Sequence, residues 1–116
     1  MPFDRETRPR ATYERAQHVM QRHSHGAEGT TEGQTFFPPD FDDIEVVRTV
    51  MDQVTYLADP DLEDDDDALM FTAEVNGVRC TVPIRFTGGE WEVRTMWPSS
   101  GRGVVTYHNG KKHPLS

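Results

Sequence analysis

Three histidines and one arginine cluster near the N-terminus, at His18, Arg22, His23 and His25. On a helix, His18, Arg22 and His25 would be spaced i, i+4 and i+7 and would share one face. Imidazole has an ordinary pKa of about 6.5, so it can accept or donate a proton at neutral pH. A guanidinium can hold a phosphate through two parallel hydrogen bonds. These side chains therefore suit the transfer of a proton to or from an oxygen bonded to phosphorus.

Two other interpretations of this cluster stay open. A solvated helix face can carry histidines that have no chemical role. A metal site is a weaker alternative, because the histidines lack the i, i+4 pair of the H-E-x-x-H motif and Arg22 would repel a dication. We therefore expect neither a metal ion nor a cofactor in this protein.

A second group of polar side chains lies between residues 93 and 103. It offers two guanidinium groups and two hydroxyls near the expected end of a strand, from Arg94, Thr95, Ser99 and Arg102. Trp97 could stack on an RNA base, as aromatic side chains do with unstacked nucleotides. The alternative is a core tryptophan followed by an ordinary Gly/Ser loop.

A third group lies near the C-terminus, where His108 and Lys111 could contact phosphate. A solvated tail is the alternative interpretation of residues 109–116. The sequence contains no nucleophile elbow, phosphate-binding loop or dinucleotide fingerprint. Its single cysteine, Cys80, is expected in the core, which argues against a reactive thiol.

The first half of the chain has helical spacing of apolar residues. One helix is expected from Pro9, with a stripe of Tyr13, Ala16, Val19 and Met20, followed by a mobile loop over residues 26–35. A second helix is expected to begin at Asp40. Its core-facing stripe is spaced by three to four residues and comprises Ile44, Val47, Val50, Met51, Val54 and Leu57. The acidic run over residues 61–67 reads as a solvated loop.

From Ala68 onward the apolar residues alternate with a period of two, which predicts strands. Asn76-Gly77 is a strong hairpin signal, and Thr87-Gly88-Gly89 predicts a second turn. A third strand is expected over residues 91–97, a loop over 98–103 and a short last strand over 104–108. These elements predict an α+β fold in which two N-terminal helices pack on a four-stranded antiparallel sheet, in the order α-α-β-β-β-β.

We expect one domain over residues 1–116, with residues 1–8 a loose leader and residues 109–116 a tail. No apolar run approaches the roughly 20 residues of a membrane span. The net charge is −8, but it is unevenly distributed. The acidic residues concentrate between residues 26 and 67, whereas all five histidines lie in the more basic end segments. Local potential steers a polyanion more than net charge does, so the ends could form a basic face.

The stretch HVMQRHSHG, the following loop ending at Phe36, the second helix and the late VRTMWP strand together resemble bacterial toxin RNase domains. These domains have the barnase–EndoU–colicin–RelE-like fold and occur in contact-dependent and other polymorphic toxins. The resemblance implies metal-independent cleavage of RNA, often tRNA, in the cytoplasm of a target cell after delivery as the C-terminal part of a secreted toxin. It also implies a cognate immunity protein as partner, and we expect a monomer.

The family histidine pattern falls on His18 and His23 with Arg22 between them, and its threonine-and-aromatic pattern falls on Thr95, Trp97 and Pro98. Family members of the EndoU type usually carry a second histidine in the Gly-rich loop. Residues 26–34 contain none here, so His25 or His108 would have to serve.

The sequence thus predicts an endoribonuclease that activates a 2′-hydroxyl with a histidine. Its predicted catalytic residues are His18, Arg22, His23 and Thr95. The predicted substrate-binding residues are His25, Arg94, Trp97, Ser99, Arg102, His108 and Lys111. The alternative is a non-enzymatic acidic protein, either an immunity protein or a nucleic-acid mimic, whose working surface is segment 40–67.

Overall fold

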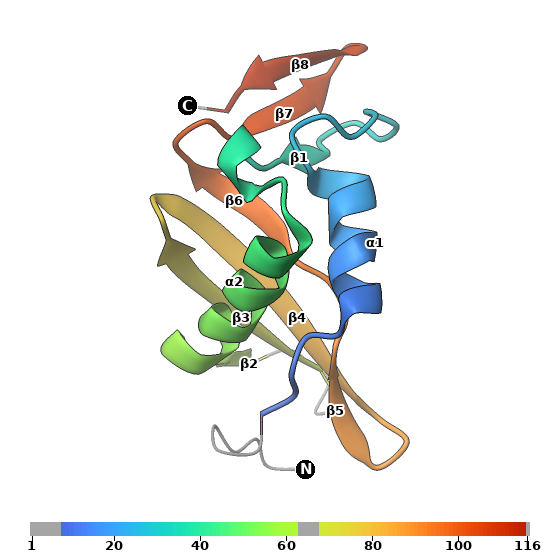
Figure 1. Cartoon of the computed structure of the whole chain (residues 1–116), viewed down its shortest axis with the longest axis vertical. Helices are drawn as coiled ribbons and strands as arrows, with labels where there is room; N and C mark the ends of the chain where they lie inside the picture. The colour runs from blue at the N-terminus through green and yellow to red at the C-terminus, as the bar shows by residue number, and fades with distance from the viewer. Residues whose placement is uncertain (1–7, 63–67, 116) are drawn as a thin grey trace.

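The computed structural model describes residues 8–62 and 68–115, and of Asp61 and Leu62 only the backbone. Over these ranges the chain forms two α-helices, one 3-10 helix and eight strands in two antiparallel sheets (Figure 1). The expected leader and the acidic run lie almost wholly outside the described residues. No helix in the described ranges is long and apolar enough to cross a membrane, which agrees with the sequence prediction.

Helix α1 (Tyr13–His23) begins later than predicted. Its N-cap is Thr12, whose hydroxyl accepts a hydrogen bond from the backbone N–H of Arg15 at 3.2 Å, so Pro9 lies outside the helix. Ala16 and Val19 are fully buried as expected. Tyr13 is 53% exposed and is therefore not part of the buried stripe. Its hydroxyl donates instead to the carboxylate of Glu45.

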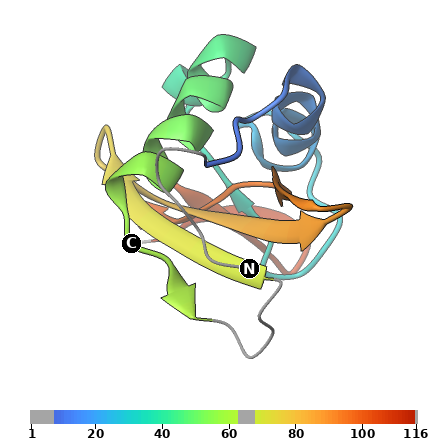
Figure 2. The same ribbon diagram turned by 90° about the horizontal axis from the view of Figure 1, so that it is seen from below.

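The second helix also begins later than predicted. Residues Pro39–Phe41 form the 3-10 helix η2, and α2 spans Ile44–Leu57. The carboxylate of Asp43 accepts hydrogen bonds from the backbone N–H groups of Glu45 and Val46, so Asp43 is the N-cap of α2. Most of the predicted stripe is buried, whereas Leu57 at the end of the helix is 62% exposed. Both helices cover the same face of the larger sheet (Figure 2).

The larger sheet contains β2 (Asp61–Leu62), β3 (Ala68–Val75), β4 (Val78–Thr87), β5 (Glu90–Val93) and β6 (Trp97–Gly101). The predicted hairpin at Asn76-Gly77 is confirmed, with φ values of 52° and 79° at the two turn residues. Buried side chains of β3 and β4 pack against the helices and form the core, among them Phe71, Val78, Cys80, Val82 and Ile84.

The predicted third strand over residues 91–97 is confirmed only for residues 91–93, and the predicted loop over residues 98–103 is wrong for residues 98–101. The strand ends at Val93, and the chain re-enters the sheet at Trp97 as β6. Strand β4 has ten residues and β5 only four, so β5 leaves part of the edge of β4 unpaired. Strand β6 pairs with that remaining part, from Val78 to Thr81. Met96, in the segment that connects β5 to β6, is fully buried.

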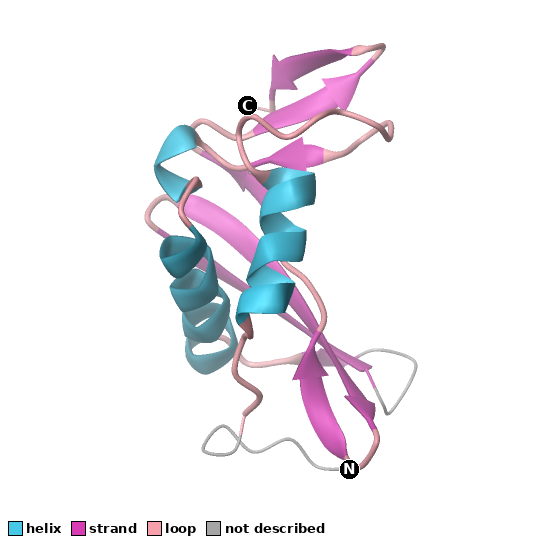
Figure 3. Cartoon of the chain, turned by 45° about the vertical axis from the view of Figure 1, so that its right-hand side comes forward, coloured by secondary structure: helices cyan, strands magenta, loops and turns pink. Residues whose placement is uncertain are grey.

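The smaller sheet contains β1 (Thr35–Phe36), β7 (Val105–His108) and β8 (Lys111–Pro114), in the order β1-β7-β8. Residues 109–116 are therefore not a simple tail, because Asn109-Gly110 closes a second hairpin with φ values of 51° and 79°. This sheet lies beyond the C-terminal end of α1, at one end of a molecule that is 41 Å long (Figure 3).

The predicted fold is thus wrong in its element order and in its single four-stranded sheet. Helices and strands are mixed as expected, but β1 lies between the two helices and the strands divide into two sheets. The physical reason is that strand edges are paired by distant segments. The two-residue strand β1 has no periodicity of its own, and it forms because β7 offers it an edge.

Candidate functional site

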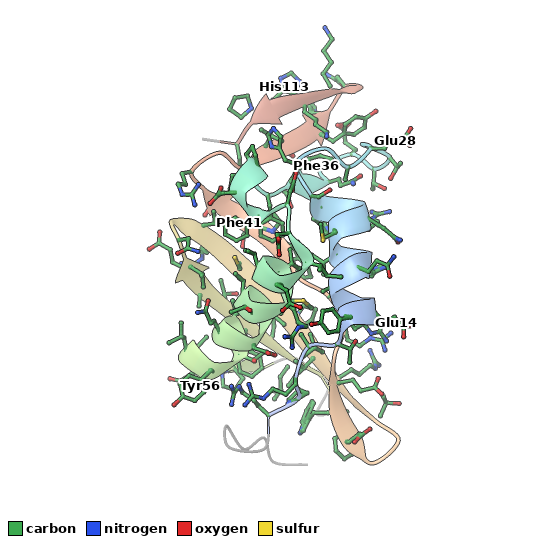
Figure 4. All side chains as sticks on the ribbon, viewed as in Figure 1. Glu14, Glu28, Phe36, Phe41, Tyr56 and His113 are labelled. Atoms are coloured by element: carbon green, nitrogen blue, oxygen red, sulfur yellow. The ribbon has the colours of Figure 1, made fainter. Side chains whose placement is uncertain are left out.

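The outer face of the smaller sheet carries polar and basic side chains. Alternate residues of a strand point to opposite faces, and the register pairs Thr35 with Thr106, Thr106 with His113, and His108 with Lys111. These five side chains therefore share one face. Phe36 is on the other face and is fully buried against the body of the molecule. His113 lies at the far end of the molecule from Tyr56 (Figure 4). We call His108, Lys111 and His113 the hairpin cluster.

The imidazole of His108 is oriented by a carboxylate from a distant loop. Its Nδ1 donates to Oε1 of Glu32 at 2.9 Å, and the backbone N–H of Asn109 donates to the same oxygen at 3.0 Å. The side-chain amide of Asn109 donates to His108 Nε2 at 3.2 Å. These contacts fit the tautomer with the proton on Nδ1, in which the lone pair of Nε2 accepts the hydrogen bond from the Asn109 amide.

A second imidazole lies next to the first. The ring centroids of His108 and His113 are 6.1 Å apart, with an angle of 62° between the ring planes. His113 Nε2 donates to the backbone carbonyl of His108 at 3.2 Å, so Nδ1 is its other proton-exchanging atom. Lys111 is the cross-strand neighbour of His108 and is exposed. Two imidazoles and one ammonium group are therefore gathered on one exposed surface.

The histidines at the end of α1 are bound to the backbone of the β1 segment. His23 Nδ1 donates to the carbonyl of Thr35 at 2.7 Å, and His25 Nδ1 donates to the carbonyl of Phe37 at 3.2 Å. Burial lowers the pKa of His23, with smaller contributions from its hydrogen bond to Thr35, which opposes the shift, and from nearby Arg22. Both rings thus fasten the end of α1 to β1, whereas His18 and Arg22 are exposed.

The second predicted group is engaged in contacts within the fold. Arg102 forms a bidentate pair with Asp40, at 2.7 and 3.0 Å, and its Nε donates to the carbonyl of Asn76 at 2.7 Å. Arg94 lies 3.7 Å from the carboxylate of Glu92. The hydroxyl of Ser99 bonds to that of Thr81 at 2.9 Å, and Trp97 pairs with Thr81 in the ladder of β4 and β6.

No hydrogen bond or ion pair among the described residues joins His23 to Arg94 or Thr95. These two residues follow β5, and Val93 of β5 lines a cavity of about 410 Å³ with Arg10, Thr12 and Arg15, at the N-terminal end of α1. His23 is at the opposite end of this 11-residue helix. At about 1.5 Å per residue, the two ends of α1 are about 15 Å apart, so His23 lies away from this cavity.

The acidic residues of the described part of segment 40–67 have internal roles. Asp40 pairs with Arg102, Asp42 accepts from the backbone N–H of His25 at 2.9 Å, and Asp43 caps α2. Asp52 accepts from the backbone N–H of Ala11 at 2.8 Å. These carboxylates form contacts within the fold, and a binding surface over segment 40–67 stays a prediction. Residues 63–67 lie outside the described residues.

Cys80 is fully buried, as predicted, and burial raises the pKa of its thiol to about 12. The thiol therefore stays protonated and is no nucleophile at neutral pH.

Four residues of the site are absent from the predicted site residues: Glu32, Gln34, Lys112 and His113. Glu32 bonds to His108 across 76 positions of sequence, which no local pattern reveals. Lys112 Nζ donates to the carbonyls of His25 and Ala27 and lies 4.1 Å from the centroid of the Phe36 ring. Only the second hairpin had a local signal, because Asn109-Gly110 repeats the dipeptide that correctly predicts the turn at Asn76-Gly77.

Comparison with known proteins adds no relative from which a function could be inferred. No family model matches the chain, and neither curated proteins nor solved structures provide a match.

Proposed function

We propose that this protein is a metal-independent endoribonuclease whose active site is the hairpin cluster on the smaller sheet. The observation that supports this most directly is the pair of imidazoles with centroids 6.1 Å apart, one of them oriented by Glu32. Lys111 adds a positive charge beside them. A general base, a general acid and a cation are the groups that RNA transphosphorylation requires.

The reaction follows from the orientation of the two rings. His108 Nε2 accepts the proton of a ribose 2′-hydroxyl, and the substrate hydroxyl replaces the Asn109 amide at that nitrogen. The 2′ oxygen forms a bond to the adjacent phosphorus as the bond from phosphorus to the 5′ oxygen breaks. Protonated His113 donates its proton to the leaving 5′ oxygen. The products are a 2′,3′-cyclic phosphate and a free 5′-hydroxyl.

Lys111 and Glu32 stabilise charge during this reaction. The ammonium of Lys111 offsets the negative charge that develops on the phosphoryl oxygens. The carboxylate of Glu32 stabilises His108 when it becomes an imidazolium, as a carboxylate does for a histidine base. The chemistry uses only side chains of the protein.

Cleavage of a labelled single-stranded RNA tests the proposal. We expect His108→Ala and His113→Ala each to lower the rate by about 10²–10⁴-fold, the contribution typical of general acid–base catalysis. Arg85→Gln is a matched surface control, because Arg85 is an exposed residue of β4 at the opposite end of the molecule. EDTA should leave the rate unchanged. Wild-type rates in both histidine variants, or activity that zinc restores after chelation, would refute the proposal.

A His18→Ala variant separates this site from the helix site that the sequence predicted. Loss of cleavage in His18→Ala, with His108→Ala fully active, would move the chemistry to α1. The same variants can be expressed in bacteria, where an active ribonuclease should reduce viability and the His108→Ala protein should not. The alternative acidic binding protein would be harmless in every form.

A further inference from the structure

We infer that Gln34 is a positioning residue that holds the loop over residues 28–34 so that Glu32 reaches His108. The inference rests on the proposed function, because it concerns the orientation of the proposed general base. Gln34 does not contact His108. It acts through the backbone that carries Glu32.

The side chain of Gln34 is a buried hydrogen-bonding centre, with only 6% of the residue exposed. Its Nε2 donates to the carbonyl of Arg22 at 2.6 Å and to that of Glu28 at 3.2 Å. Its Oε1 accepts from the backbone N–H groups of Thr30 at 2.9 Å and Thr31 at 3.2 Å. One amide therefore joins the end of α1 to both halves of the loop. The loop that the sequence predicted to be mobile is ordered by these bonds.

The backbone of Gln34 fixes the other side of the loop. Its N–H donates to the carbonyl of Thr31 at 3.0 Å, which closes a four-residue turn with Glu32 and Gly33 at its centre. Gly33 has φ 85°, the positive value that a type II turn requires at this position. The Tyr107 N–H donates to the carbonyl of Gln34 at 2.8 Å, and the Gly33 N–H donates to that of Tyr107 at 2.9 Å. Glu32 is thus held next to the residue that precedes His108.

Two further contacts press the loop against the strands of the site. A Cβ at Gly29 would overlap the ring of Tyr107, so only glycine fits at this distance. Lys112 of β8 donates to the carbonyl of Ala27, where the loop begins. An exposed carboxylate and imidazole gain little from each other in water, because solvent screens their attraction. The pair therefore depends on a backbone that already holds both partners in place.

The experiment compares Gln34→Ala, Glu32→Ala and the double variant with the wild-type protein. Each single change should lower kcat/KM for RNA by about 10–100-fold, as loss of a residue supporting a catalytic group does. Because both act through the same bond to His108, the double variant should be no slower than the slower single variant. Multiplicative effects in the double variant would overturn the inference. Gly26→Ala is the matched loop control, because a Cβ at Gly26 meets no atom within 4 Å.

Nitrogen-15 NMR of His108 provides a readout that does not depend on cleavage. The wild-type spectrum should show the tautomer with the proton on Nδ1, and both single variants should lose this preference. Retention of that tautomer in Gln34→Ala would overturn the inference even if RNA is cleaved. This readout also keeps the inference testable if the protein proves not to be a ribonuclease.

Hydrogen exchange of the wild-type protein tests the inference without any variant, so it applies even if a variant fails to fold. The N–H groups of Thr30 and Thr31 both bond to Gln34 Oε1, so they should exchange much more slowly than free peptide groups. Exchange at the rate of an unstructured peptide would show that Gln34 does not hold the loop.

Discussion

At the scale of single residues, His23 connects the end of α1 to the smaller sheet. Its Nδ1–H bonds to the Thr35 carbonyl, while the backbone carbonyl of His23 accepts from the N–H of Phe37 at 2.7 Å. The side chain and the backbone of His23 thus bond to the edge of β1 that β7 does not pair with, where a neighbouring strand would otherwise bond. Since burial lowers the pKa of His23 below its ordinary value of 6.5, the folded protein favours the neutral ring.

This burial predicts how stability depends on pH. Below pH 6.5 the unfolded chain binds a proton at residue 23 more readily than the folded chain, so the free energy of unfolding rises with pH. The contribution is complete above pH 6.5 and is lost as the pH falls through the lowered pKa of the folded state. Urea unfolding at a series of pH values from about 5 to about 8 would measure this change in the free energy of unfolding.

A His23→Gln variant should flatten this part of the pH profile. His18→Gln is its control, because it removes an exposed imidazole from the same helix. A wild-type pH profile in His23→Gln would show that burial of His23 does not contribute to the acid sensitivity.

At the scale of secondary-structure elements, the hairpin of β7 and β8 determines the positions of the side chains in the hairpin cluster. Hairpins of two strands are marginally stable alone, and this one gains a third strand from β1. Its two-residue turn places Asn109 and Gly110 at φ 51° and 79°, as a type I′ turn requires. The turn sets the register that brings His108 opposite Lys111 and His113 within reach of His108.

We expect Gly110→Ala to loosen this hairpin. An alanine at positive φ is disfavoured by about 1–2 kcal/mol, so β8 should fray and His113 should lose its position. Slower RNA cleavage and faster amide exchange along β8 should appear together. Asn109→Gly is the control for exchange, because glycine is compatible with the same turn. Unchanged protection of β8 in Gly110→Ala would contradict the prediction.

At the scale of the whole molecule, the net charge of the chain differs from the local charge of the hairpin cluster. The chain has a net charge of −8, yet the hairpin cluster lies at one end of a 41 Å molecule. At physiological ionic strength, charges are screened over about 8 Å. Asp40, Asp42 and Asp52 bond to other groups of the fold, so we expect the local charge of the hairpin to govern how a phosphate approaches it.

This arrangement predicts the salt dependence of RNA binding. Lys111→Gln removes one phosphate contact, so the slope of log K against log salt should decrease by about 0.7 for a single strand. Arg85→Gln removes the same charge from the other end of the molecule and should leave the slope unchanged. Titrations of labelled RNA into catalytically inactive His108→Ala protein, over a range of salt concentrations, would measure both. Equal slopes for Lys111→Gln and the wild-type protein would show that RNA binds elsewhere.

The sequence by itself determined the elements whose signals are local. Helix α2 follows from a stripe of apolar residues at three-to-four spacing, and the hairpin of β3 and β4 follows from period-two alternation around Asn76-Gly77. Burial of Cys80 was predicted from the same alternation. In each case neighbouring residues decide the structure through backbone geometry and the side on which apolar groups lie.

Only the tertiary structure decided which segments meet. It determined that β6 completes the edge of β4, that β1 joins the C-terminal hairpin, and that Arg102 is bound by Asp40 across 62 positions. The candidate site shows the same division. His108 and Lys111 were predicted as phosphate contacts, but the pairing of His108 with Glu32 and His113 was not. Partners of this kind are fixed by long-range packing, because a sheet edge or a carboxylate has no sequence signal that specifies its distant partner.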